Sequence, residues 1–399
     1  MCTPQSRRKL NRPCSRFRAV WAGPWRPSPG TGRIDIQKKE TGVQKKTNRF
    51  VPLVAGGVLG AAMLPAAAQS NVTIYGVVDA AMTRTTGGGY NQTAMDGRGI
   101  LQGSRLGFRG TEDLGNGLKA LFQLEQGLNV DTGTAPPGAP AGESWAFQRQ
   151  AWVGLGGAWG TLGLGRQYAP GYATARFDIL EGSGLYSARG WLTSVGGYTI
   201  NPGSPARWSN SVRYMSPDLS GFSFEGIYSN YNNEDPARTR HPSGDDRWAM
   251  GFGYAKGPGE IGVVYHNVGV GAGVEDTREF FIGGSWDFGF LKAMATWQRK
   301  DAEVRSGDNR LWSVGVVVPV LTSSAFHLGY ASLDVKGRDN DSNSLSTGFV
   351  HNLSKRTALY AILNRMHHDD LAPNLSGIEQ PIQPGETAST WALGVRHKF

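Results

Sequence analysis

Only a few stretches of this 399-residue chain combine side-chain types and spacing that suit chemistry. His367-His368-Asp369-Asp370 offers groups that bind metal ions, but it lies in a predicted polar loop without a second cluster, so we favour a solvated loop. Val268-Gly-Val-Gly-Ala-Gly273 has only the glycines of a phosphate loop, because no helix and no Lys-Ser/Thr pair follow it. We therefore predict no catalytic group, no cofactor and no metal site.

The pattern that dominates the chain is an alternation of side chains with a period of two, which is typical of β-strands whose two faces meet different environments. In the last strand, Trp391, Leu393, Val395, His397 and Phe399 share one face, and mostly small or basic residues share the other. Similar alternation recurs at 71–82, 105–111, 119–125, 222–229, 248–254, 279–287, 312–318 and 326–331. A last strand that is needed to its final residue is expected in a closed barrel, where it pairs with the first strand.

The first part of the chain predicts export from the cytoplasm. A basic cluster at 45–49 precedes an apolar run and small residues that end at Ala68, so we predict a signal peptide over residues 45–68. The run is too short to span a bilayer, which takes roughly 20 apolar residues. Residues 1–44 form a basic leader, and we hypothesise that translation begins near Val43.

Removal of residues 1–68 changes what the charge of the chain implies. The formal net charge of the whole chain is +9, but that segment holds 13 of the 41 Lys and Arg residues and only 2 of the 32 acids. The remaining 28 bases and 30 acids nearly balance, so we predict no nucleic-acid partner. Both cysteines, Cys2 and Cys14, also lie in this segment, which leaves the exported part without thiols.

The connectors between the predicted strands distinguish a membrane barrel from a soluble sandwich. Short turns alternate with long polar loops, and aromatic residues recur near strand ends, as at the two interfaces of an outer-membrane barrel. The short connectors are 113–117, 158–160, 217–221, 256–260 and 352–355, and the long ones are 131–143, 168–205, 230–246, 302–309 and 367–386. We predict an all-β, transmembrane antiparallel barrel of about sixteen strands over residues 69–399, with a water-filled lumen.

Motifs spread over the same part of the chain occur in a distinctive order. They are Val72-Thr-Ile-Tyr-Gly-Val-Val-Asp79, Ser104-Arg-Leu-Gly-Phe-Arg-Gly-Thr-Glu112, Phe147-Gln-Arg-Gln-Ala-Trp-Val-Gly-Leu155, Leu164-Gly-Arg-Gln167, Ser209-Asn-Ser-Val-Arg-Tyr-Met-Ser-Pro217, Val350-His-Asn-Leu-Ser-Lys-Arg356 and Gly394-Val-Arg-His-Lys-Phe399. In these motifs the chain resembles Gram-negative outer-membrane general porins of the beta-proteobacterial trimeric type. The resemblance covers essentially all of residues 69–399 and leaves out residues 1–44.

This resemblance implies a passive, water-filled channel for small hydrophilic solutes and ions across the outer membrane. It implies a homotrimer surrounded by outer-membrane lipids, with one pore in each subunit and a long third loop, here roughly 168–205, folded into that pore. It also implies that the barrel assembly machinery of the outer membrane reads the terminal aromatic residue, Phe399.

The resemblance further implies a pore constriction with acidic residues on the third loop and basic residues on the barrel wall. Asp178 matches the loop acid, and Glu181 is a nearby addition. The wall arginines that match are Arg105, Arg149 and Arg207. Charges that oppose each other across a narrow aqueous gap orient dipolar solutes, and an excess of arginine would enrich anions.

Strand parity tests these assignments. It predicts that four arginines face the lumen: Arg105, Arg109, Arg207 and Arg213. On the strand that holds the last two, Trp208, Val212 and Tyr214 are expected on the opposite, lipid-facing side. Arg149 and Arg166 fit less well, because they share parity with apolar neighbours, and a β-bulge would be needed to turn them inward.

Three alternative roles stay open from the sequence. The arginines could serve only as salt-bridge partners that hold the loop in place. The barrel could act mainly as an adhesin or receptor through outer loops such as 131–143 and 367–386. An outer-membrane enzyme is a third reading, but the sequence shows no arranged catalytic cluster for it.

Overall fold

The computed structural model describes residues 71–135, 146–180, 186–230, 246–269, 275–302, 308–336, 341–369 and 384–399. The predicted leader (1–44) and signal peptide (45–68) lie outside these residues, as do Glu181 and most of the outer loops at 131–143 and 367–386. Those predictions therefore stay predictions.

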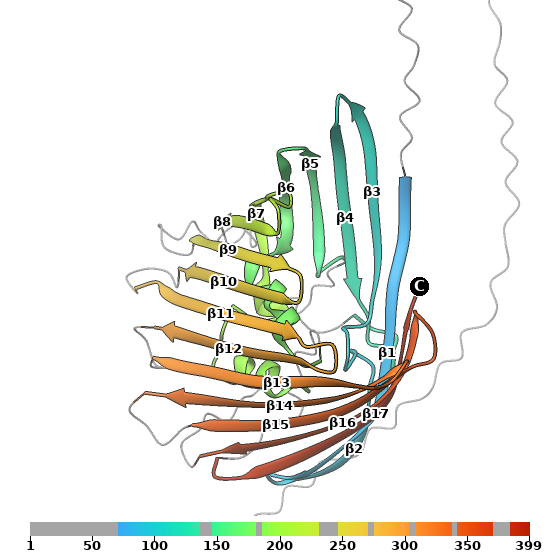
Figure 1. The fold of residues 1–399 in the computed structure, drawn as a ribbon, viewed down its shortest axis with the longest axis vertical. Helices are drawn as coiled ribbons and strands as arrows, with labels where there is room; N and C mark the ends of the chain where they lie inside the picture. Colours follow the sequence, from blue (N-terminus) through green and yellow to red (C-terminus); the bar gives the residue numbers. More distant parts are fainter. Residues whose placement is uncertain are drawn as a thin grey trace, which may run out of the picture. The chain divides into compact units, whose positions relative to one another are not determined.

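The described residues form almost entirely antiparallel β-structure (Figure 1). The strands are β1 (Asn71–Gly87), β2 (Tyr90–Asp96), β3 (Arg105–Gly115), β4 (Leu118–Gly127), β5 (Gln150–Gly157), β6 (Gly160–Tyr168), β7 (Arg207–Met215), β8 (Phe222–Asn230), β9 (Asp246–Lys256), β10 (Gly259–Val268), β11 (Thr277–Asp287), β12 (Lys292–Asp301), β13 (Asn309–Leu321), β14 (Ser324–Val335), β15 (Ser342–Asn352), β16 (Thr357–His368) and β17 (Thr387–Lys398). Three short helical segments lie between β6 and β7: η1 (Pro170–Phe177), α1 (Ala188–Val195) and η2 (Ser204–Ala206). None of the helices in the described ranges has the length and apolar character needed to cross a membrane.

The first strand closes the sheet into a barrel. β1 pairs with β17 along one edge, and along its other edge it pairs with both β2 and β3. Because β2 lies beside the second half of β1 and β3 beside the first half, these two strands share one place in the barrel. The seventeen strands of the described residues thus fill sixteen positions, which confirms the predicted closed barrel. Gly76 and Phe399 exchange two backbone hydrogen bonds of 3.1 Å, so the pairing reaches the last residue.

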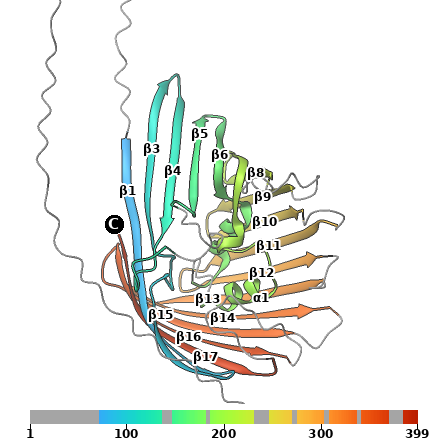
Figure 2. The same ribbon diagram turned by 180° about the vertical axis from the view of Figure 1, so that it is seen from behind.

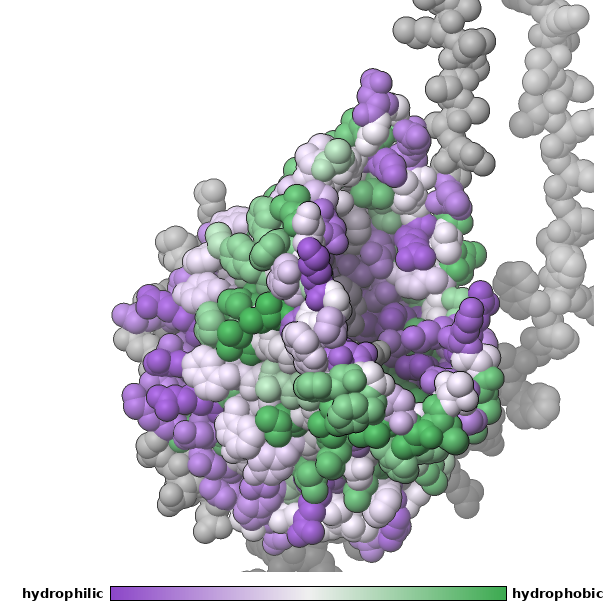
Figure 3. Space-filling view, viewed as in Figure 1, coloured by the Kyte–Doolittle hydropathy of each residue, from purple (hydrophilic) through white to green (hydrophobic). Residues whose placement is uncertain are grey.

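The alternation of side chains separates an apolar outer surface from the inside of the barrel. On β17, Trp391 and Leu393 are 54% and 63% exposed on the outside, whereas Ala392 between them is fully buried. The same alternation runs through β11 and β13. Figure 3 shows hydrophobic residues over much of the outer surface and hydrophilic residues around the hollow into which this view looks. Apolar side chains spread over the outer face of the strands suit contact with lipid.

The described residues of the long third loop, 169–180 and 186–206, lie inside the ring of strands in both ribbon views (Figures 1 and 2). It packs against inward-facing apolar residues of β10 to β16, where Leu192 and Ile200 of the loop are fully buried. The carboxylate of Glu279 on β11 accepts hydrogen bonds from the backbone N–H groups of Thr199 and Ile200 at 2.8–2.9 Å. The predicted folding of this loop into the pore is therefore confirmed, and the apolar core of the barrel lies between the loop and this wall.

A second segment, residues 97–104 between β2 and β3, also turns inward. Ile100 and Leu101 are almost fully buried, and they belong to the same apolar cluster as Leu180 of the third loop. The carboxylate of Asp79 on β1 holds the segment by accepting hydrogen bonds of 2.9 Å from the backbone N–H groups of Leu101 and Gln102. Two segments, this one and the third loop, therefore pack against each other inside the barrel.

Candidate functional site

One carboxylate on β4 organises the basic residues of the pore wall. Glu125 forms ion pairs with Arg149 at 2.7 Å and with Arg105 at 3.4 Å. It also accepts hydrogen bonds from the hydroxyl groups of Tyr168 at 2.9 Å and Tyr75 at 3.0 Å. Charge-assisted bonds of this kind fix the geometry of the guanidinium groups. The structure thus brings together Arg105 and Arg149, which the sequence placed on different strands.

A β-bulge turns Arg166 toward the same place. Gly165 pairs with Ser211 and Gln167 pairs with Trp208, so that Arg166 alone of β6 lies opposite two residues of β7. The Nε group of Arg166 donates to the backbone carbonyl of Gln148 at 2.6 Å, beside Arg149 in the chain. The extra residue of the bulge belongs to β7, so the bulge resets the parity of β7, whereas on β6 the regular strand is interrupted at Gly165, just before Arg166, where φ is +131°.

The same bulge corrects the prediction for Trp208. This residue was expected on the lipid-facing side, but it is fully buried inside the barrel, edge-to-face with His266 at 5.1 Å. Asn210 of the bulge has a φ of +49°, a left-handed conformation that asparagine tolerates better than most residues. Arg207, next to Trp208, places its guanidinium carbon 5.9 Å from the centre of the Tyr168 ring and interacts electrostatically with Arg149 and Arg166.

We call Arg105, Arg149, Arg166 and Arg207, together with Glu125, the arginine cluster. Arg105 and Arg149 pair with the carboxylate of Glu125, Arg166 bonds to the chain beside Arg149, and Arg207 interacts electrostatically with Arg149, so four guanidinium groups gather around one carboxylate. Tyr172 of the third loop lies beside these arginines, and its ring stacks on Tyr168 with 3.7 Å between centroids. Burial alone would raise the pKa of Tyr172, but Arg149, Arg105 and Arg207 hold that pKa below its ordinary value.

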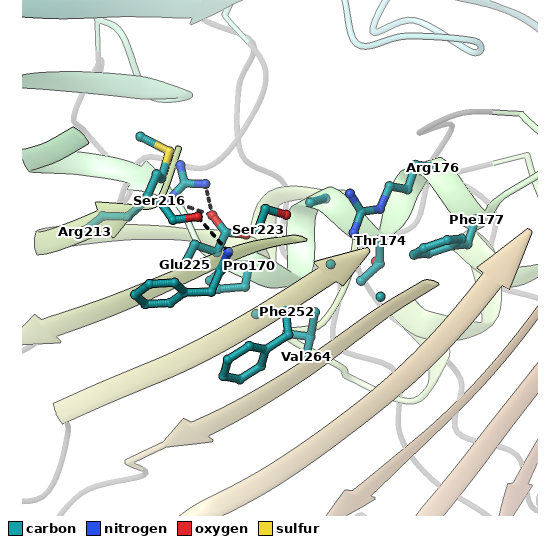
Figure 4. A pocket seen from close by; sticks show the side chains of 16 residues that line it. Pro170, Thr174, Arg176, Phe177, Arg213, Ser216, Ser223, Glu225, Phe252 and Val264 are labelled. Atoms are coloured by element: carbon teal, nitrogen blue, oxygen red, sulfur yellow. Dashed lines mark hydrogen bonds and ion pairs between the residues drawn. The ribbon is translucent and has the colours of Figure 1, made fainter. Parts of the chain in front are cut away.

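Two of the predicted arginines lie outside this cluster. Arg109 is exposed, with its guanidinium carbon 5.3 Å from the centre of the Tyr75 ring. Arg213 is paired with Glu225 of β8, close to a cavity of about 230 Å³ between η1 and strands β7 to β10 (Figure 4). We call this cavity the niche, and its polar lining includes Arg176, Arg213, Ser216, Ser223 and Glu225.

Asp178, the loop acid that the resemblance singled out, lies inside the loop with 3% of its surface exposed. Its carboxylate accepts hydrogen bonds from the N–H of Leu180 at 3.0 Å and from the hydroxyl of Ser187 at 2.7 Å. Ser187 in turn caps the N-terminus of α1 by accepting from the N–H of Gly190. Burial raises the pKa of Asp178, and the positive charge of Arg189 offsets only part of this effect.

Some residues of the site were not predicted from the sequence. Glu125 was assigned only to a strand face, although the tight turn at 115–117 fixes a register in which Gly107 lies opposite Glu125. Arg105 is then the diagonal neighbour of Glu125, so counting from the turn would have found the pair. Arg189 had no sequence signal, because only the folded loop brings it to Thr174 and Gln298. The described residues hold no group of three or more His, Cys, Asp or Glu side chains that is arranged for a metal ion.

Known proteins resemble this chain in sequence and in fold. A family model described as Gram-negative porin matches residues 55–371. Outer membrane porin protein 32 of Delftia acidovorans is 31% identical over 360 residues, which cover 87% of this chain and 99% of the relative. An outer membrane porin protein of Bordetella pertussis is 29% identical over 89% of this chain and 100% of its own length. The solved structure of the anion-selective porin from Comamonas acidovorans matches with a TM-score of 0.69 and 28% identity, covering 83% of this chain and all of that one.

A closed sixteen-position barrel with an apolar outside, a charged inside and an inward third loop defines a water-filled channel of the outer membrane. The chain belongs to the Gram-negative porin family, as the sequence resemblance indicated. It is therefore a passive diffusion channel through which small hydrophilic solutes cross the Gram-negative outer membrane. The family consists of channels and not of enzymes.

Proposed function

We propose that this porin favours small anions over cations and that the arginine cluster sets the preference. One observation carries the proposal: Arg105 and Arg149 pair with the same carboxylate of Glu125, and Arg166 and Arg207 lie beside them. A narrow aqueous passage lined by one sign of charge concentrates ions of the opposite sign. The anion selectivity named for the relative from Comamonas acidovorans supports the proposal.

We also propose how each side of the constriction contributes. Arg105, Arg149 and Arg207 attract the anion from the wall, while the third loop narrows the passage opposite them. Asp178 supports the loop through Ser187 and does not oppose the arginines as a second pole, because its carboxylate is buried among its own hydrogen bonds. Glu181 lies outside the described residues and stays a predicted loop acid. Arg109 and Arg213 lie outside the arginine cluster and are not part of this selectivity site.

The reversal potential of the protein in planar bilayers tests this preference. Under a gradient of KCl concentration, an excess of chloride over potassium permeability gives a potential of the sign expected for an anion-selective channel. A potential of the opposite sign in an open, conducting channel would refute the proposal. The measurement should be made at low ionic strength, because salt screens the charges of the cluster.

The functional unit that we propose is a homotrimer embedded in outer-membrane lipid, with one pore per subunit. The family resemblance supports a trimer, and the exposed apolar residues of the barrel wall provide surface for both subunit and lipid contacts. Single insertions into a planar bilayer should close in three equal steps under high voltage. Insertions that always close in one step would argue for isolated subunits.

We propose further that the barrel assembly machinery reads Phe399. A Cβ atom added to Gly76 would lie 2.3 Å from the Phe399 ring, so the absence of a side chain at Gly76 makes room for this aromatic group. Deletion of Phe399 should lower the yield of assembled protein in the outer membrane and leave the conductance of the remaining channels unchanged. Normal yield of the deletion variant, quantified from isolated membranes, would contradict this role.

A further inference from the structure

The niche beneath η1 differs from the arginine cluster in the balance of its charges. At one end, Arg213 is paired with Glu225, and these side chains are 15% and 17% exposed. At the other end, Arg176 is paired with Glu260 at 3.2 Å. Figure 4 shows Arg213 and Glu225 side by side, with Arg176 farther along on η1. The niche thus carries no net charge, although it contains strong donors and acceptors.

The Arg213–Glu225 pair leaves part of its hydrogen-bonding capacity unused. The Nε group and one terminal nitrogen of Arg213 both donate to the Oε2 atom of Glu225. In the described part of the chain, the Oε1 atom of Glu225 and the other terminal nitrogen of Arg213 have no hydrogen-bond partner. An arginine has five N–H donors and a carboxylate has about four acceptor positions, so each partner can bind one more group.

An apolar surface lies beside these polar groups. Pro170 and Phe177 of η1 and Val264 of β10 line the cavity. Gly251 on the wall lacks a side chain, and a Cβ atom there would lie 2.8 Å from Pro170 and 3.2 Å from Glu225. The wall glycine therefore gives η1 room to approach, and it keeps the carboxylate of Glu225 next to carbon surface.

We propose that the niche binds small zwitterionic solutes of the amino-acid type, with the ammonium group on Glu225 and the carboxylate on Arg213. A solute with only one charge pairs with one partner and is repelled by the other, whereas a zwitterion satisfies both. The apolar lining accommodates a short hydrocarbon side chain. This inference rests on the proposed channel function and specifies a solute class for one subsite of the pore.

The experiment uses three probes of similar carbon skeleton on the full-length channel in planar bilayers. L-leucine carries both charges at neutral pH, 4-methylpentanoate lacks the ammonium group, and 3-methylbutylamine lacks the carboxylate. Leucine should reduce the ion current in a saturable manner with a midpoint in the millimolar range. The two singly charged probes should act with midpoints about tenfold higher, as expected when one charge-assisted contact is lost.

Two variants give a signature that a purely structural role of the pair would not produce. Glu225→Gln should weaken the effect of leucine about tenfold and strengthen that of 4-methylpentanoate, because Arg213 is freed. Arg213→Gln should weaken leucine similarly and strengthen 3-methylbutylamine, because Glu225 is freed. Arg299→Gln is a matched control, since Arg299 forms an exposed pair with Asp301 at 2.6 Å, outside the niche lining. It should leave all three midpoints unchanged.

The outcomes separate this inference from the proposed function. An anion-selective channel whose current shows no saturable response to leucine would overturn the zwitterion site and leave the proposed function intact. The site would also be overturned if Glu225→Gln and Arg213→Gln channels conduct but do not strengthen the effects of 4-methylpentanoate and 3-methylbutylamine, respectively. A protein that inserts without conducting ions would refute the channel function and the subsite together. If one variant does not assemble into the membrane, the reciprocal change in the other still decides the question.

Discussion

The arginine cluster and the niche both include residues of β7, but they differ in how many carboxylates pair with their arginines. β7 gives Arg207 to the cluster and Arg213 to the niche, and six residues along a strand span roughly 20 Å. In the cluster, Arg105 and Arg149 share the carboxylate of Glu125, whereas in the niche Arg176 and Arg213 each have a carboxylate of their own. The count of arginines therefore does not set local selectivity, because the number of acids within contact of them decides the remaining charge.

The third loop contributes to both regions. Tyr172 reaches the cluster, and Arg176 reaches the niche from the next turn of η1. The far end of the loop is held by Glu279 on β11 and by Lys300 on β12, whose ammonium group donates to the carbonyl of Gly197 at 3.0 Å. The difference between the two regions thus depends on how firmly the loop is held against the opposite wall.

Replacement of Glu279 by alanine should have the largest effect, because it loosens the element that shapes both regions. The change leaves the buried N–H groups of Thr199 and Ile200 unpaired, at a cost of about 1–3 kcal/mol each. We expect a higher single-channel conductance and a smaller reversal potential. Glu112→Ala, at an exposed position on β3, is the control. An unchanged conductance in assembled Glu279→Ala channels would show that other contacts hold the loop.

Changes of single charges in the cluster should alter selectivity by an intermediate amount and in predictable directions. A unit charge about 5 Å from an ion in water changes the energy of the ion by about 0.8 kcal/mol, or roughly fourfold in occupancy. Arg149→Gln should lower the ratio of chloride to potassium permeability by up to this factor, and Glu125→Gln should raise it. The double variant removes one positive and one negative charge, so its permeability ratio should return close to the wild-type ratio. If both single variants lowered the ratio, loss of geometry rather than charge would be the cause.

The sequence predicted the barrel well because each strand residue meets either lipid or the lumen. Residues such as Trp391 and Leu393 had no other stable place than the outer surface, so alternation and loop lengths were sufficient. The approximate extent of the third loop was also readable from its length and polarity, since it lies between two well-marked strands.

The details of the site were less predictable, because they depend on contacts that no local pattern records. The bulge opposite Arg166 moved Trp208 to the inside, and the backbone is irregular there at Gly165 and at the left-handed Asn210. Asp178 looked like a pore acid from its motif, but the spacing to Ser187 and the start of α1 gives its carboxylate a helix-supporting contact. Parity and motifs place residues near a pore, and register and packing decide which of them face it.

Alkaline pH should produce a smaller change, restricted to the cluster. Because Tyr172 has a pKa below its ordinary value, it loses its proton at lower pH than a typical tyrosine and adds a negative charge beside the arginines. Chloride preference should therefore fall as pH rises toward 10. The fall should be weaker in Tyr172→Phe, and Tyr254→Phe serves as the control. A pH profile that is identical in wild type and Tyr172→Phe would show that Tyr172 does not titrate in this range.

The smallest effect on ion selectivity should come from the niche. Removal of both charges in the double variant Arg213→Gln/Glu225→Gln leaves the local net charge unchanged, so the reversal potential should stay at the wild-type value. Each single variant should shift it slightly and in opposite directions, because each leaves one charge unbalanced near the ion path. Reversal potentials of all three variants, recorded at the same low salt as Arg149→Gln, make the comparison direct. A shift in the double variant as large as that of Arg149→Gln would mean that selectivity is set along the whole of β7 and not by the arginine cluster.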